Sequence, residues 1–253
     1  MKALVTGASG FLGGAIVRQL LAQGHQVRSL CRSEVPDLTA SGVEVLRVDL
    51  RDRDAAIAAM RGSDTVFHTA GVAGISGPWT RYYGSNVAAT MHVVAGCLEH
   101  GVGRLVFTSS PSVTFDGTDQ CGVDESTAYP TRWLCHYPRS KAMAEQHVLQ
   151  SNGKGGLLTC ALRPHLVWGP GDRHLVPGLI QRRRANRLWQ VGDGANLVDM
   201  VYIDNAAEAH VLAARALAPG AAAAGRAYYI SQGEPVNCWD WINDILALAG
   251  IPP

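Results

Sequence analysis

Residues 2–13 of the chain read KALVTGASGFLG, a short apolar run followed by three closely spaced glycines. The apolar run KALVT predicts a strand over residues 2–6, and the pattern FLGGAIVRQLLAQG predicts a helix over 11–24 that stops at Gly24. The same alternation continues along the chain. We predict further strands over 25–31, 43–49, 64–70, 103–110 and 157–164, and further helices over 52–61, 86–101 and from 135 onward. Repeated strand–helix units of this kind indicate an α/β fold with a doubly wound parallel sheet.

The turn between the first strand and the first helix carries glycines at positions 7, 10 and 13. In this context Gly7 permits the tight turn, Gly10 removes a side chain where the backbone approaches a pyrophosphate, and Gly13 lets helix and strand pack closely. The free N–H groups and the positive dipole end of the helix favour phosphates. An ordinary tight turn is the alternative, but the position between a strand and a helix indicates the Rossmann type of dinucleotide site.

The end of the second predicted strand indicates which dinucleotide binds. Sites for NAD usually place an acidic residue there to hold the ribose 2′-OH, whereas a nearby arginine accommodates the 2′-phosphate of NADP. Here Cys31 stands at the acidic position, and Arg32 and Ser33 follow it. We therefore predict NADP as the cofactor, with NAD as the alternative if Arg32 is only a solvated surface charge.

The stretch CHYPRSKAMAEQ (135–146) places Tyr137 four residues before Lys141. Residues at this spacing lie on one helix face, and Pro138 is tolerated in a first helical turn. A neighbouring ammonium lowers the pKa of a phenol, so the pair is a candidate proton donor and acceptor for an alcohol or ketone. Chance spacing on an exposed helix is the alternative. Ser109 and Ser110 strengthen the catalytic interpretation because they end the predicted strand 103–110, where ligands of such sheets bind.

Together, the glycine turn and the Ser, Tyr and Lys set resemble the extended branch of the short-chain dehydrogenase/reductase superfamily. By this resemblance Tyr137 is the catalytic acid/base, Lys141 lowers its pKa and holds the nicotinamide ribose, and Ser110 polarises the reacting oxygen. Ser85 stands where related epimerases often carry asparagine, so we expect no cofactor role for it. The resemblance implies cofactor contacts from Gly7, Gly10, Phe11, Leu12, Gly13, Arg32, Asp49, Leu50, Thr69, Ala70, Gly71, Tyr137, Lys141, Pro164 and His165.

The second half is similar to 3β-hydroxysteroid dehydrogenases, sterol-4α-carboxylate 3-dehydrogenases and, most of all, bacterial 2-alkyl-3-oxoalkanoate reductases. The segments that carry this similarity are LRPHLVWGPGDRHLVPGLI, VGDGANLVDMVYIDNAAEAH and GRAYYISQGEP, together with GVGRLVFTSSPSVT before them. The resemblance implies hydride transfer between NADPH and the C3 carbonyl or hydroxyl of a lipid-like 3-oxo or 3-hydroxy acid. A 3β-hydroxysteroid dehydrogenase, a sugar-nucleotide epimerase or dehydratase, and a cofactor-sensing regulator remain alternatives.

The strand–helix rhythm breaks at Pro164. We predict a cofactor-binding core over residues 1–163 and a mixed segment over 164–253 that returns to the core and forms a smaller substrate lobe. Members of the related groups continue beyond the ending at Pro252-Pro253, so a truncated chain is one interpretation. Candidate substrate contacts, against the alternative that tryptophans are core residues and Arg173 a surface charge, are Trp79, Trp168, Trp189, Leu197, Arg173 and His174.

Composition narrows the function classes. The chain of 253 residues has 47% hydrophobic and 17% charged residues and a formal net charge of +1, which fits a globular protein and gives no electrostatic case for nucleic acid. The six cysteines form no Cys-x-x-Cys pair, so we expect no metal site, no disulfide framework and a cytoplasmic location. We also expect no transmembrane segment, a small-molecule substrate and a homodimer.

Overall fold

The computed structural model describes residues 1–252, and its centre is a parallel sheet of seven strands in the order β10-β6-β5-β4-β1-β2-β3. The order reverses between β1 and β4, as in a doubly wound Rossmann sheet. The sheet strands are β1 (Lys2–Thr6), β2 (Gln26–Cys31), β3 (Glu44–Arg47), β4 (Thr65–His68), β5 (Arg104–Thr108), β6 (Leu158–Pro164) and β10 (Arg226–Ile230).

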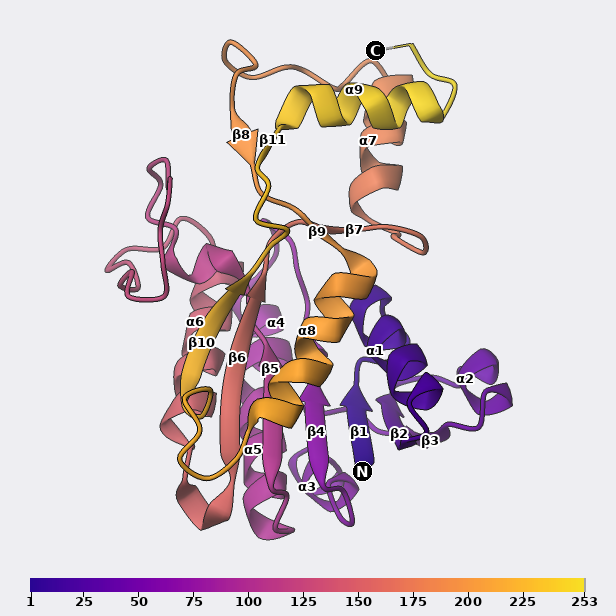
Figure 1. The fold of residues 1–253 in the computed structure, drawn as a ribbon, viewed down its shortest axis with the longest axis vertical. Coiled ribbons are helices and arrows are strands. Elements are labelled where there is room, and N and C mark those ends of the chain that lie inside the picture. The colour runs from indigo at the N-terminus through magenta and orange to yellow at the C-terminus, as the bar shows by residue number, and fades with distance from the viewer. Residues whose placement is uncertain (253) are drawn as a thin grey trace.

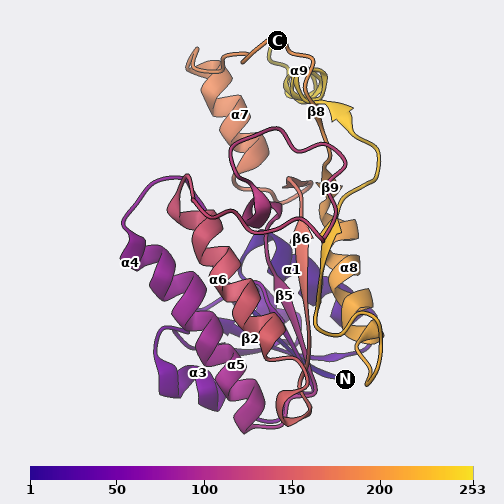
Figure 2. The ribbon, with the colours of Figure 1, turned by 90° about the vertical axis from the view of Figure 1, so that its left-hand side faces the viewer.

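Helices cover both faces of the sheet. Figure 2 shows α3, α5 and α6 on one face and α1 and α8 on the other. The helices are α1 (Phe11–Ala22), α2 (Pro36–Ala40), α3 (Arg53–Ala59), α4 (Trp79–Tyr82), α5 (Ala89–Glu99), α6 (His136–Gln150), α7 (Leu175–Arg184), α8 (Ile203–Ala216) and α9 (Cys238–Leu248), with a π-helix η1 (Tyr83–Ala88) and 3₁₀ turns η2 (Pro111–Thr114) and η3 (Lys154–Gly156).

Two apolar cores lie on opposite faces of the sheet because successive strand residues point to opposite sides. Val5 of β1 and Phe67 of β4 belong to one core, whereas their neighbours Leu4 and Val66 belong to the other. All four side chains are fully buried. Burial on both faces explains why these strands read as continuous apolar runs rather than as alternating ones.

The strands and helices predicted for the first 164 residues are confirmed, with one difference of type. The predicted helix 86–101 begins earlier, because α4, the π-helix η1 and α5 follow one another without a break from Trp79 to Glu99. The predicted helix 52–61 corresponds to α3, where the Asp52 carboxylate caps the first turn by accepting from the Ala55 N–H at 3.1 Å. A π-turn has no hydrophobic period of its own, so the sequence pattern gave no sign of it.

The chain after β6 divides its elements between the main sheet and a separate group of elements, at the top of Figure 1. Strand β10 pairs with β6, and α8 packs on α1, where Gln19 donates to the Asp204 carbonyl at 2.8 Å. Helices α7 and α9 instead share a small core of Leu179, Ile242 and Leu246. Two short strand pairs complete this part of the chain: β7 (Val167–Trp168) with β9 (Val201–Tyr202), and β8 (Leu197–Val198) with β11 (Val236–Asn237).

Membrane-spanning helices and metal-binding clusters are both absent from residues 1–252. None of the helices in this range is both long and apolar enough to cross a membrane. The same residues contain no cluster of three or more His, Cys, Asp or Glu side chains placed to hold a metal ion. All six cysteines are free thiols.

Candidate active site

The glycine-rich turn has a backbone that only glycine fits at two positions. Gly7 has φ +71°, and a Cβ there would lie 2.9 Å from the Ala70 Cα. A Cβ on Gly13 would lie 2.4 Å from the Gly7 carbonyl oxygen, closer than any real Cβ contact. Gly10 is the N-cap of α1 and donates its N–H to the Gly7 carbonyl at 2.9 Å. The start of the helix therefore stands open beside β4, as a phosphate cradle requires.

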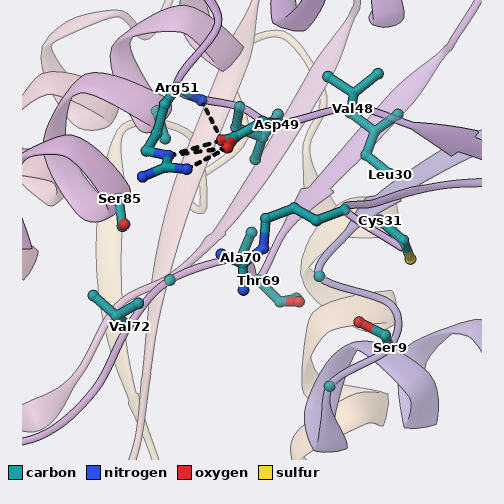
Figure 3. Close-up of a pocket in the computed structure, with 16 residues that line it drawn as sticks. Ser9, Leu30, Cys31, Val48, Asp49, Arg51, Thr69, Ala70, Val72 and Ser85 are labelled. Carbon is teal, nitrogen blue, oxygen red and sulfur yellow. Dashed lines mark hydrogen bonds and ion pairs between the residues drawn. The ribbon is translucent and has the colours of Figure 1, made fainter. Parts of the chain in front are cut away.

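A cavity of about 290 Å³ lies against this turn, at the carboxyl ends of β1, β2, β3 and β4 (Figure 3). Eight of the predicted cofactor residues line it: Gly7, Gly10, Arg32, Asp49, Leu50, Thr69, Ala70 and Gly71. Ser85 also lines it, although we expected no cofactor role for a serine where related epimerases often carry asparagine. The glycine cradle and the mixed polar and apolar wall fit a dinucleotide.

The other predicted cofactor residues lie outside this cavity wall. Phe11 and Leu12 start α1 and pack against the core, and Gly13 lies directly under the Gly7 carbonyl. Pro164 ends β6 opposite Ile230 of β10. His165 follows it, and its Nδ1 is hydrogen-bonded to the Asp199 carbonyl oxygen. Pro164 and His165 therefore stand at the carboxyl edge of the sheet, two strands away from β4.

The end of β2 is apolar and is faced by arginine. Cys31 is buried, with its Sγ 3.5 Å from the Ser29 hydroxyl. Across the cavity Asp49 accepts three hydrogen bonds from the Arg51 guanidinium, the shortest at 2.6 Å from Nη2 (Figure 3). This hydrogen bonding with Arg51, with a smaller contribution from the charge of Arg32, holds the pKa of the Asp49 carboxyl at about 2. We did not predict a role for Arg51, although its place two residues after Asp49 was a usable signal.

The loop after β4 is fixed by Asn86 of the π-helix. The buried Asn86 amide accepts from the Val72 N–H at 2.8 Å and donates to the Val72 carbonyl at 3.0 Å. The same amide nitrogen lies 2.9 Å from the Ser140 hydroxyl on α6. Asn86 therefore ties the cofactor wall to the helix that carries Tyr137. We did not predict this role, because it depends on a contact across the fold.

Tyr137 and Ser110 meet at the carboxyl end of β5. Ser110 caps η2, where its hydroxyl accepts from the Ser112 N–H at 3.2 Å and lies 2.8 Å from the Ser112 hydroxyl. Burial raises the pKa of the Tyr137 phenol, and a side-chain hydrogen bond with Ser110 opposes that rise. The phenol is therefore protonated at neutral pH and is placed to donate.

Lys141 is buried one turn further along α6. Its Nζ donates to the Thr108 carbonyl at 2.6 Å and lies 4.1 Å from the centre of the Phe107 ring. Burial lowers the pKa of this ammonium from 10.5 to about 7, although the charge of Glu145 opposes the change. An amine with a pKa near neutral exchanges a proton readily.

The candidate substrate residues do not form one wall. Trp168 packs edge-on against Tyr202 and Trp241, at 5.4 and 5.6 Å between ring centres, and Trp79 lies under the Arg139 guanidinium. In contrast, Trp189 and Leu197 are exposed, as are Arg173 and His174.

Comparison with known proteins gives the chain its relatives. The model of the 3-beta hydroxysteroid dehydrogenase/isomerase family matches residues 4–252. The 2-alkyl-3-oxoalkanoate reductase of Stenotrophomonas maltophilia (strain K279a) is 50% identical, over 100% of this chain and 77% of that protein. The protein of the same name from Shewanella oneidensis (strain MR-1) is 45% identical, over 99% of this chain and 67% of its own length.

A solved structure agrees with the fold and the cofactor class. MoeE5 in complex with UDP-glucose and NAD has a TM-score of 0.83 and 30% identity, and the match covers 100% of this chain and 83% of that one. With these relatives, the chain is an oxidoreductase of the short-chain dehydrogenase/reductase type that uses a nicotinamide cofactor. It belongs to the 3-beta hydroxysteroid dehydrogenase/isomerase family.

Proposed function

We propose that this enzyme uses NADPH to reduce the C3 carbonyl of a lipid-like 3-oxo acid, or catalyses the reverse oxidation. The observation that carries the proposal is the convergence of Ser110, Tyr137 and Lys141 at the carboxyl end of β5. The Ser110 side chain acts on the pKa of the Tyr137 phenol, and the Lys141 ammonium is buried on the next turn of α6. When bound, the cofactor supplies the hydride.

In this proposal the chain's own groups move the proton. The Tyr137 phenol is neutral at pH 7, because burial raises its pKa, so it can donate to the oxygen of a ketone. The Ser110 hydroxyl orients that oxygen. The Lys141 ammonium, with a pKa near 7, is suited to return a proton to the phenolate and to stabilise its negative charge.

NADPH rather than NADH is supported by the charges around Cys31. The position that holds a ribose 2′-OH in NAD sites carries a thiol, and two guanidinium groups, from Arg32 and Arg51, border the same cavity. Asp49 neutralises part of this charge through its ion pair with Arg51. Arg32, which is exposed, is left to meet a 2′-phosphate.

The substrate class is supported by the two reductases that share 50% and 45% identity with the chain. We propose that residues 1–163 form the cofactor-binding core and that residues 164–253 form the substrate lobe, of which Pro253 lies outside the described residues. The small apolar core between α7 and α9 and the edge-packed Trp168 suit a substrate with an alkyl chain. We also propose that the protein is a homodimer and that it is cytoplasmic. Its six free thiols agree with a reducing compartment.

The test is an absorbance assay of purified protein with NADPH or NADH and a panel of 2-alkyl-3-oxo acids, 3-oxosteroids and UDP-sugars. We expect oxidation of NADPH with the 3-oxo acids and a rate that depends on the length of the alkyl chain. Turnover of the steroids alone would show that the substrate is a steroid and not a 3-oxo acid. Interconversion of UDP-sugars without net loss of NADPH would show that the enzyme is an epimerase and not a reductase. Light scattering of the same sample tests the dimer.

A further inference from the structure

His68 is a fully buried imidazole that the proposed chemistry does not use. It is the last residue of β4, directly before the loop 69–72 that lines the cofactor cavity. Its Nδ1 lies 2.7 Å from the Thr6 hydroxyl, and its Nε2 lies 2.9 Å from the Thr90 hydroxyl. Both ring nitrogens therefore have hydroxyl partners, one on β1 and one on α5.

The neighbours of the two hydroxyls fix the position of the imidazole proton. Thr90 donates its only proton to the Asn86 carbonyl at 2.6 Å, so it accepts from His68 at Nε2. Thr6 accepts from the Ala70 N–H at 3.2 Å, so its own proton is free to go to Nδ1. Of the two neutral tautomers, only the one with hydrogen on Nε2 satisfies all of these bonds.

This tautomer completes a directed line of hydrogen bonds across the site. The line starts at the Ala70 N–H in the cavity wall and passes through Thr6, His68 and Thr90 to the carbonyl of Asn86. Beyond Asn86 it continues through the amide to the hydroxyl of Ser140, which donates to the Tyr137 carbonyl at 2.8 Å. The loop of the cofactor wall and the first turn of the catalytic helix are thus ends of one network.

The surroundings of His68 also favour a neutral ring. Burial and the nearby Lys141 charge lower its pKa to about 3. The ring packs on Phe107 at 5.6 Å between centres, and the Lys141 ammonium lies over the same Phe107 ring. A charged imidazole would therefore stand one aromatic ring away from the ammonium that the mechanism needs.

We propose that His68, as the Nε2–H tautomer, is a positioning residue that sets the π-helical turn of Asn86, and through it the Tyr137 turn, against the cofactor wall. This inference rests on the proposed function, because it assigns a role within the same site. Its physical basis is the steep dependence of rate on the placement of reacting groups.

The test removes one hydroxyl of the network without changing its volume. Thr90→Val leaves the His68 Nε2–H unpaired and removes the side-chain donor to the Asn86 carbonyl, whereas Thr90→Ser keeps both bonds. We expect Thr90→Val to lower kcat at saturating NADPH about tenfold, with the NADPH Kd changed less than about threefold, and Thr90→Ser to restore kcat to within about twofold. Wild-type kcat in Thr90→Val, with only a lower Tm, would overturn the proposal.

The matched control is Thr159→Val. Thr159 is also buried, and its hydroxyl also donates to a backbone carbonyl, that of Val148 at 3.0 Å, but it lies on β6 outside this network. It should lower Tm and leave kcat unchanged. An equal loss of kcat in Thr159→Val would show a general effect of lost hydroxyls and would also overturn the proposal.

A second measurement does not depend on turnover. Nitrogen-15 NMR of the histidine rings should show His68 as the neutral Nε2–H tautomer at pH 7 and still at pH 5. A proton on Nδ1, or a charged ring at pH 6, would contradict the inference directly. If the enzyme reduces none of the offered ketones, the proposed function fails, while this spectrum and the NADPH Kd still test His68.

Discussion

The carboxyl edge of β1 to β5, here called the rigid region, and the segment that follows β6 differ in how tightly their groups are held. At the first, the ligand-facing groups come from strand ends and are locked by glycines without room for a Cβ and by buried polar residues such as Asn86. At the second, α7 and α9 share only three buried apolar residues, and large side chains stay in water: Trp189 is 75% and Leu248 86% exposed.

The two regions suit ligands of different kinds. A cofactor of constant shape suits a site in which every backbone group is placed, because misplacement costs rate. A substrate with a variable alkyl chain suits a looser apolar surface, because small changes in an apolar pocket alter binding only modestly. If so, changes at the first region should affect chemistry or cofactor, and changes at the second should affect the substrate alone.

The strongest way to break this contrast is Tyr137→Phe. Removing the phenolic hydroxyl deletes the proposed proton donor while leaving the ring in place, so we expect kcat to fall about 10³-fold. The NADPH Kd, measured by cofactor fluorescence, should stay within about twofold of the wild-type value. Full activity in this variant would remove the mechanism, whereas lost cofactor binding would show that Tyr137 is structural.

Two glycine-to-alanine changes compare the regions directly. In Gly13→Ala the new methyl lies 2.4 Å from the Gly7 carbonyl, so we expect a loss of about 3 kcal/mol in the free energy of unfolding, together with weaker NADPH binding. In Gly178→Ala on α7 the methyl meets nothing within 4 Å, and better helix propensity should add up to about 1 kcal/mol. Urea unfolding measures both, and equal effects would erase the contrast.

Leu246→Ala probes the small apolar core of the second region. Leu246 is almost completely buried between α7 and α9, so truncation should cost about 2–3 kcal/mol and raise the KM for the 3-oxo acid. The NADPH Kd should not change. Leu20→Ala, on the buried face of α1, the helix that follows the glycine turn, is the matched truncation and should weaken NADPH binding. A reversed pattern would place the substrate elsewhere.

The sequence predicts the carboxyl edge of β1 to β5 better than it predicts the segment after β6. The turn at Gly7, the strand ends and the Ser110, Tyr137 and Lys141 set were all available from local patterns, because strand order brings parallel carboxyl ends together. Asn86 and His68 were not, since their roles depend on hydrogen bonds to residues at least 14 positions away in the chain.

The second region was less predictable for a physical reason. The sequence predicted a return to the core but not β10 as the seventh strand, nor the full-length helix α9. Of the tryptophans proposed as substrate contacts, Trp168 packs edge-on against Tyr202 and Trp241, and Trp189 is exposed. Tryptophan fits a core, a ligand wall or an interface equally well by composition, so its place is decided by tertiary contacts.

The cofactor preference offers a finer test of the rigid region. Arg32→Ala removes the guanidinium proposed to meet a 2′-phosphate, and we expect about tenfold weaker NADPH binding with NADH binding within about twofold of wild type. Arg51→Ala should have a smaller effect, because its charge is shared with Asp49. Fluorescence titration with both cofactors measures this. Equal losses for NADPH and NADH would instead make Arg32 a general phosphate or adenine contact.

The last and smallest expected effect is a change with pH in the free energy of unfolding, caused by the burial of Lys141. Lys141 is held in a buried site where the pKa of its ammonium is about 7 instead of 10.5. Between these values the unfolded chain binds the proton and the folded protein releases it, so the free energy of unfolding rises with pH in this window. Below pH 7 both states are protonated, and the full cost of burying the charge remains.

Lys141→Met keeps a long side chain and removes the charge. The variant should be inactive yet more stable than wild type at pH 7, and the difference in unfolding free energy should shrink by about 1 kcal/mol or more between pH 7 and pH 9. Urea unfolding at both values measures the gap, with Lys154→Met as the exposed control that should show no such change. A gap that stays constant with pH would mean that Lys141 keeps its ordinary pKa. The ammonium would then act as a fixed positive charge beside Tyr137, and its burial would not lower the stability of the rigid region.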